Sequence, residues 1–145
     1  MMEILSASLR DLNALRKLES ACFDKDAWPF LDLLAVLSFP EVIRIKAVED
    51  DQMIGFIAGD LRLSEGFAWI ATIGVHPHYQ RRGIGRSLLR ACESRLNVPR
   101  IKLTVRMSNF GAITLYEQEG YKTTNIWKSY YNDGEDGVVM EKTKV

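Results

Sequence analysis

Hydrophobic and polar positions along the first part of this chain predict one short strand followed by two helices. The expected elements are a strand over residues 2–7, a helix with an apolar side of Leu9, Leu12, Leu15, Leu18 and Cys22, a polar and aromatic loop over 23–30, and a short helix over 31–37. Ser8 and Asp11 resemble a capping box, with Asp in place of the usual Glu, at the start of the first helix.

The rest of the chain alternates between strand and helix patterns. It predicts strands over 42–48, 53–63 and 67–75, a helix ending near Leu96, a strand over 100–106, a helix over 110–118 capped by Gly120, and a closing hairpin of 121–131 and 138–142. The resulting order, β-α-α-β-β-β-α-β-α-β-β, predicts a single α/β (or α+β) domain over residues 1–145 with a mixed sheet.

The most informative segment is the turn Gln80–Gly85, which reads Gln-Arg-Arg-Gly-Ile-Gly. An apolar strand over 67–75 precedes it, and apolar residues at helical spacing follow it. Such a turn directs backbone N–H groups and the positive end of a helix dipole at one point, which suits a polyphosphate. The alternative is a glycine-containing connection that binds nothing.

The turn lacks the features of two common phosphate loops. It has no Walker A lysine, and Leu88 stands where a dinucleotide-binding fingerprint has its third glycine. Its form, Gln/Arg-x-x-Gly-x-Gly/Ala, resembles the acetyl-CoA pyrophosphate loop of the GNAT superfamily of acyltransferases.

Two further segments extend this resemblance over nearly the whole chain. The stretch Asn109–Tyr121 is similar to the GNAT pattern Asn-x-x-Ala-x-x-x-Tyr-x-x-x-Gly-Phe/Tyr at every fixed position. The segment 130–136, with Met140 after it, resembles the C-terminal hairpin of protein N-terminal acetyltransferases, a group that includes the ribosomal-protein alanine N-acetyltransferases. The resemblance implies a GNAT fold: a mixed, mostly antiparallel sheet of six to seven strands, about four flanking helices, and two central strands that splay apart.

Composition and charge narrow the partners. Hydrophobic residues make up 47% of the 145 residues, and 19 basic residues balance 19 acidic ones. Zero net charge gives no general attraction to nucleic acid, and no apolar run is long enough to span a membrane. Cys22 and Cys92 are expected to be buried free thiols in a reducing cytoplasm, and His76 and His78 lack partners at metal-ligand spacing, so no metal is expected.

The resemblance assigns the cofactor contacts and the general acid. Acetyl-CoA would be bound by backbone groups of Ile73 and Val75, by the turn residues Arg81, Gly83, Ile84, Gly85 and Arg86, and by Asn109 and Tyr116. Tyr116 would protonate the departing thiolate, a role suited to a phenol. Seven residues of helix place Asn109 and Tyr116 on one side, about 10 Å apart along the axis. Their ordinary alternatives are a helix N-cap and a half-buried core tyrosine.

The sequence departs from the family pattern at the base. Relatives often carry Glu or His at the position of Thr104, and others a Tyr at the position of Trp69. Neither Thr104 nor Trp69 is a useful base near neutral pH. The hypothesis is that Thr104 anchors a water that takes the proton, so Thr104 is included with Tyr116 among the catalytic candidates.

The acceptor side is the least specified. By resemblance Tyr130 would line a peptide groove, with Trp28 and Phe30 as its opposite wall. If both tyrosines lie in a strand, alternation points Tyr130 and Tyr131 to opposite faces, so only one of them can line the groove. The predicted function is transfer of acetyl from acetyl-CoA to a protein N-terminal α-amine by direct attack, in a monomer or homodimer. A small-molecule or lysine acetyltransferase and a non-catalytic acyl-CoA sensor are the alternatives.

Overall fold

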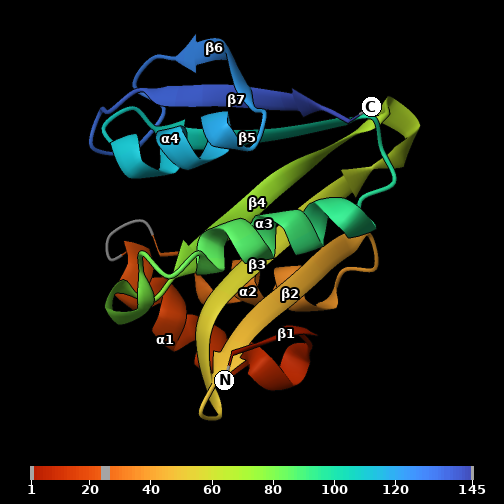
Figure 1. Ribbon diagram of the computed structural model, residues 1–145, viewed down its shortest axis with the longest axis vertical. Helices are drawn as coiled ribbons and strands as arrows, with labels where there is room; N and C mark the ends of the chain where they lie inside the picture. Colours follow the sequence, from red (N-terminus) through yellow and green to blue (C-terminus); the bar gives the residue numbers. More distant parts are fainter. Residues whose placement is uncertain (1, 24–26, 145) are drawn as a thin grey trace. The chain divides into compact units, whose positions relative to one another are not determined.

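The computed structural model describes residues 2–23 and 27–144 (Figure 1). The chain forms two compact units. Unit 1 comprises Met1–Leu61 and Ala71–Leu96, and unit 2 comprises Arg62–Ile70 and Asn97–Val145. Strand β4 (Phe67–Val75) runs through both units. The predicted loop over 23–30 falls partly on residues 24–26, which lie outside the described residues.

The order of helices and strands follows the predicted order. Within the described residues, unit 1 carries β1 (Glu3–Ser6), α1 (Leu12–Phe23), α2 (Phe30–Ser38), β2 (Val42–Glu49), nearly all of β3 (Gln52–Arg62) and α3 (Ile84–Arg95). Unit 2 carries β5 (Arg100–Arg106), α4 (Phe110–Gln118), β6 (Lys122–Trp127) and β7 (Gly137–Thr143). Most bounds lie within one or two residues of the predicted ones.

The strands form one mixed sheet. The hydrogen-bonded order is β1-β2-β3-β4-β5-β7-β6. Pairs β1–β2, β2–β3, β5–β7 and β6–β7 are antiparallel, whereas β4 and β5 pair in parallel over Phe67–Trp69 and Arg100–Lys102. This sheet and the four helices of the described part confirm the predicted α/β fold class.

In unit 1 the alternation along β3 decides which helices pack on which face. A methyl group added at Gly55 would lie 2.9 Å from Leu88 Cδ1, and one at Gly59 would lie 3.0 Å from Cys92 Sγ, so α3 packs closely on this face. Phe56 instead belongs to the core cluster formed by α1 and α2. The close approach at the two glycines places α3 directly against β3, and the glycine turn leads into this helix.

The start of the first helix confirms the capping box and corrects one core residue. The Ser8 hydroxyl accepts from the Arg10 N–H, and the Asp11 carboxylate accepts from the Ser8 N–H at 2.8 Å. The box caps a short 3-10 turn, Leu9–Asp11, that leads into α1. Leu9, predicted to lie on the apolar side, is 50% exposed because the turn points it away from the core.

In unit 2 the hairpin differs from the prediction at its tip. Strand β6 ends at Trp127, so Tyr130 and Tyr131 lie in the connection to β7 rather than in a strand. Ser129 has a positive φ of 51°, which breaks the extended backbone just before them. The alternation argument for the two tyrosines is therefore wrong.

Candidate active site

The glycine turn of unit 1 has the backbone geometry of an anion site. Arg81 and Gly83 both have positive φ, 66° and 76°. Gly83 is the N-cap residue of α3 and has no side chain that could bind the first amides of the helix. The helix's own ladder begins with the Ser87 N–H donating to the Gly83 carbonyl at 3.0 Å, which leaves the amides of Ile84 and Gly85 outside that ladder. These amides and the helix dipole make the turn suited to a diphosphate.

The two arginines of the turn have different environments. The Arg82 guanidinium donates to both carboxylate oxygens of Glu49, at 2.7 and 3.1 Å, and lies over the Tyr79 ring at 5.5 Å. This pairing lowers the pKa of Glu49 and raises that of Arg82. The ion pair anchors the turn to the end of β2, whereas Arg81 is exposed on the neighbouring backbone position.

The last part of β4 leads into the turn. Ile73 and Val75 are half-buried, and the Val75 carbonyl accepts from the Gln80 side-chain amide at 3.3 Å. The His76 N–H donates to the Ile54 carbonyl at 2.8 Å. These bonds hold the candidate pantetheine-binding strand and the turn together within unit 1.

Trp28 and Phe30, the candidate acceptor residues of unit 1, flank the start of α2. Phe30 is 47% exposed, and the Arg16 guanidinium lies 5.4 Å from its ring centre. Trp28 is partly buried against the α1–α2 core cluster. It borders a cavity of about 310 Å³ that is also lined by Asp32, Ala35, Val36, Phe39, Val42, Asp60 and Ala71.

Glu19 is a buried carboxylate that sequence reasoning missed. Its Oε1 accepts from the Trp28 N–H at 3.3 Å and its Oε2 from the Thr72 hydroxyl at 3.2 Å. Burial raises its pKa, and the two donors only partly oppose this effect. Glu19 thus links α1, the segment before α2 and β4. The available signal was its position four residues after Leu15, inside the apolar side of the helix.

In unit 2 the structure brings Thr104 and Tyr130 together around Gly137. A methyl group added at Gly137 would lie 2.9 Å from Thr104 Cγ2 and 3.1 Å from a ring carbon of Tyr130. Trp69, the second sequence position considered for a base, contacts Trp127 with ring centres 6.0 Å apart, and Trp127 contacts Tyr130 at 5.2 Å. Through these rings and Gly137, Trp69 and Thr104 both border Tyr130 within this unit.

Asn109 and Tyr116 differ in their surroundings. Asn109 is exposed and caps α4, its Oδ1 accepting from the Ala112 N–H at 3.2 Å. Tyr116 is buried at 6% exposure, and its ring lies 6.0 Å from that of Tyr121. Burial, and secondarily the Tyr131 phenol, raises the pKa of Tyr116, so this phenol keeps its proton across the neutral range.

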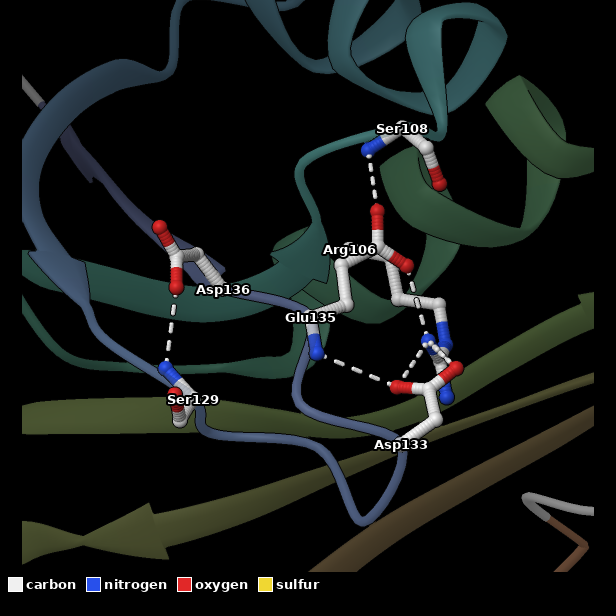
Figure 2. A network of polar contacts seen from close by, with 6 residues as sticks. All are labelled: Arg106, Ser108, Ser129, Asp133, Glu135 and Asp136. Carbon is white, nitrogen blue, oxygen red and sulfur yellow. Dashed lines mark hydrogen bonds and ion pairs between the residues drawn. The ribbon is translucent and has the colours of Figure 1, made fainter.

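Tyr130 and Tyr131 contact each other directly, with ring centres 5.0 Å apart and planes at 89°. Tyr130 is 51% exposed. The Arg106 guanidinium lies 4.2 Å from the centre of the Tyr131 ring. The connection that carries both rings is held by ion pairs from Asp133 and Glu135 to Arg106 (Figure 2). The sequence singles out the segment that contains these carboxylates but does not predict their pairing with Arg106.

The described part of the chain contains neither a cluster of metal ligands nor a helix that could span a membrane. Across residues 2–23 and 27–144, no three His, Cys, Asp or Glu side chains lie together as metal ligands. None of the helices described there has both the length and the apolar character needed to cross a membrane. Within the same residues neither cysteine forms a disulfide; Cys92 is buried as expected, whereas Cys22 is only partly buried, which corrects that expectation. Partial burial raises the pKa of Cys22 to about 12.

The Acetyltransferase (GNAT) family matches residues 12–121, well over half of the chain. The chain belongs to this family. The same stretch contains the glycine turn, β4, β5 and the whole of α4, so it covers two of the three segments that resemble the family in sequence. The third segment, 130–136, lies beyond it. The predictions of a GNAT fold and of an N-acetyltransferase are confirmed.

Individual relatives agree with this assignment. An uncharacterized N-acetyltransferase of Methanocaldococcus jannaschii is 31% identical over 99% of this chain and 92% of its own length. The ribosomal protein bS18-alanine N-acetyltransferase of Salmonella typhimurium is 36% identical over 68% of this chain and 69% of its own length. The crystal structure of the ribosomal-protein-S18-alanine N-acetyltransferase from Escherichia coli superposes with a TM-score of 0.88 at 30% identity, covering 99% of this chain and 94% of that one.

Proposed function

We propose that this chain transfers the acetyl group of acetyl-CoA to the α-amine of a protein N-terminus. The observation that carries the proposal is the similarity, over nearly the full length, to an enzyme named for acetylating the alanine of a ribosomal protein. A cytoplasmic location, a single domain over 1–145 and a monomeric or homodimeric state belong to the same proposal.

The residues of the two units take separate roles in this proposal. In unit 1, the amides around Gly83 and Gly85 bind the diphosphate of acetyl-CoA, with Ile73 and Val75 binding its pantetheine and acetyl amides. Trp28 and Phe30 contact the acceptor. The N-cap residue supports the first role, because Gly83 has no side chain of its own that could bind the first amides of α3.

The chemistry of unit 2 follows from a protonated phenol. The acceptor nitrogen attacks the thioester carbonyl, the C–S bond breaks, and Tyr116 gives its proton to the departing sulfur. Its raised pKa supports this role, since the proton is present before the reaction begins. Thr104 holds a water that takes the proton from the attacking amine, and Tyr130 lies beside the acceptor.

A water-relayed base suits an α-amine better than a lysine. With a pKa near 7.7, about one third of an α-amine is neutral at about pH 7.4, whereas only about 0.1% of a lysine with a pKa near 10.4 is neutral. The threonine at position 104 therefore favours N-terminal acceptors over the lysine and small-molecule alternatives.

The test compares three acceptors with one preparation of the protein. The panel contains a peptide with a free N-terminal alanine and an internal lysine, the same peptide blocked at its N-terminus, and spermidine, with product located by mass spectrometry. Acetylation of the free N-terminus alone is expected. Modification of the blocked peptide or of spermidine supports the alternatives, and CoA binding without acceptor-dependent thiol release supports a sensor.

Two variants test the residues. Tyr116→Phe is expected to lower kcat by about 100-fold with little change in acetyl-CoA affinity. Thr104→Val is expected to lower turnover while acetyl-CoA affinity is unchanged. An unaltered rate in either variant removes that residue from the proposed mechanism.

A further inference from the structure

The connection between β6 and β7 carries three carboxylates that bind different parts of unit 2 (Figure 2). Glu135 is the one that reaches the segment between β5 and α4. Its Oε2 accepts from the backbone N–H of Ser108 at 2.8 Å, and its Oε1 accepts from Arg106 Nη1, also at 2.8 Å. One side chain therefore binds both the last residue of β5 and the residue before Asn109.

Asp133 completes the contact from the same loop. Both of its carboxylate oxygens accept from Arg106 Nη1, at 3.0 and 3.1 Å, and Oδ1 also accepts from the Glu135 N–H at 3.1 Å. The Arg106 guanidinium is in turn stacked on the Tyr131 ring. The loop is thus folded around Arg106, with Glu135 held in place to reach Ser108.

The contact of Glu135 with the Ser108 N–H lies directly before the start of helix α4. Ser108 stands next to Asn109, the N-cap of α4, and its carbonyl accepts from the Phe110 N–H at 2.9 Å. Helix α4 has nine residues, Phe110–Gln118, and Tyr116 lies near its end. Because a helix is a stiff rod, a shift at its first turn moves every side chain along it.

Asp136 provides a natural comparison on the next residue. It also accepts from a backbone N–H, that of Ser129 at 2.9 Å, and its second oxygen pairs with Lys128 at 3.3 Å. Both Glu135 and Asp136 have lowered pKa values, mainly because each accepts hydrogen bonds. Within the part of the chain that the structure describes, the Asp136 side chain binds Ser129 and Lys128 of the hairpin, whereas its backbone carbonyl accepts from the Met107 N–H at 3.2 Å. Neutralising the side chain therefore keeps this backbone contact to the segment before α4.

We propose that Glu135 is a positioning residue that fixes the start of α4, and through it Asn109 and Tyr116, by holding the Ser108 N–H against Arg106. The inference rests on the proposed role of Tyr116 as general acid. It assigns to the acidic hairpin tip a part in setting the acid's position, in addition to any contact that Tyr130 makes with an acceptor.

The test pairs Glu135→Gln with Asp136→Asn, two neutralisations on adjacent residues. A glutamine has one carbonyl oxygen in place of the two carboxylate oxygens, and its NH2 group cannot accept from the donor that it faces. We expect Glu135→Gln to lower kcat by about tenfold with acetyl-CoA affinity within about twofold of the original, and Asp136→Asn to change both by less than about twofold. Equal losses in the two variants, or no loss in Glu135→Gln, would overturn the proposal.

Two readouts separate positioning from general destabilisation. Amide hydrogen exchange at Ser108 and Asn109, followed by NMR, should accelerate by about tenfold in Glu135→Gln and stay unchanged in Asp136→Asn. Glu135→Asp, whose carboxylate is one methylene shorter, should not restore kcat. Unchanged exchange at Ser108 in Glu135→Gln, or full activity in Glu135→Asp, contradicts the proposal.

A double variant distinguishes this inference from the mechanism on which it depends. If Glu135 acts through Tyr116, Glu135→Gln added to Tyr116→Phe should lower kcat by less than about twofold more. A further tenfold loss shows that Glu135 acts elsewhere and overturns the positioning role. Full activity in Tyr116→Phe alone instead refutes the acid assignment, and the exchange at Ser108 still decides whether Glu135 anchors α4.

Discussion

Two glutamates, one in each unit, hold neighbouring segments in the same way but in opposite electrostatic settings. Glu19 accepts from the Trp28 N–H and is buried, with a hydroxyl as its second donor. Glu135 accepts from the Ser108 N–H and from the Arg106 guanidinium, and its side chain is partly exposed. Burial raises the pKa of Glu19, whereas hydrogen bonds lower that of Glu135.

The comparison shows that two carboxylates that bind a backbone N–H in the same way can change the stability of the fold with pH in opposite directions. A buried carboxylate without a cation is more easily protonated in the folded state than in the unfolded state, and a paired one less easily. Acid therefore increases the stability that Glu19 contributes to unit 1 and decreases the stability that Glu135 contributes to unit 2. Four measurements test this contrast between Glu19 and Glu135.

The largest expected effect is that of Glu19→Ala. The variant leaves the Trp28 N–H and the Thr72 hydroxyl without their acceptor and opens a cavity, so we expect a loss of about 3 kcal/mol in the free energy of unfolding. Urea denaturation measures it, with Glu3→Ala as a control on an exposed edge of β1. A loss no greater than the control's would show that Glu19 anchors nothing.

The pH dependence of Glu19 is the next largest effect. Its folded pKa lies above the unfolded value of about 4.3, so the folded state binds more protons between these two values, and stability falls as pH rises through that window. The limiting slope is about 1.4 kcal/mol per pH unit. Glu19→Gln should remove this fall, which denaturation midpoints at a series of pH values would show. A slope equal to that of the original protein would refute the raised pKa.

A smaller effect is expected from Thr72→Val, which removes one donor and keeps the shape of the side chain. The carboxylate of Glu19 keeps its bond to the Trp28 N–H, so the expected loss at neutral pH is about 1 kcal/mol. Because the charged form loses a donor, the pKa of Glu19 should rise further. Stability measured at acid and neutral pH tests both parts, and a loss that is equal at the two pH values would contradict the second.

The smallest effect on stability is that of Glu135→Gln. Its lowered pKa means that the unfolded state binds more protons below about pH 4.5, so the stability that it contributes is present above that pH and is lost as pH falls through the folded pKa. The variant should be less sensitive to acid than the original chain. Glu49 and Asp136 also have lowered pKa values and keep part of the slope, so only a partial flattening is expected. An unchanged acid midpoint would contradict the assignment.

The sequence predicted best those features whose signals are local. The turn at Gly83 and the helix that carries Tyr116 were recognisable from a dozen residues each, because a strand period, a glycine pair and a helical period stand next to one another. Strand β5 and helix α4 have the predicted bounds. The expectation of two buried thiols is confirmed for Cys92, whereas Cys22 is only partly buried.

What the sequence could not show were contacts between distant segments. Glu135 and Ser108 are 27 residues apart, and Glu19 and Thr72 are 53 apart, so their pairing depends on how the strands are arranged. The two tyrosines were misplaced for a different reason. Ser129 adopts a left-handed conformation with no glycine or proline to signal it, and the strand pattern appeared to continue.

The glycine at position 137 has a practical consequence for the two side chains beside it, which the proposed function assigns to the acceptor and to the water that takes its proton. Gly137 does not have a positive φ, so alanine is compatible with the backbone there and the cost of substitution is steric. The added methyl group would press on Thr104 and Tyr130, which lie against it from two sides. Substitution at this strand position therefore offers protein engineers a way to displace an aromatic wall by a fraction of an ångström while every reacting group keeps its chemistry.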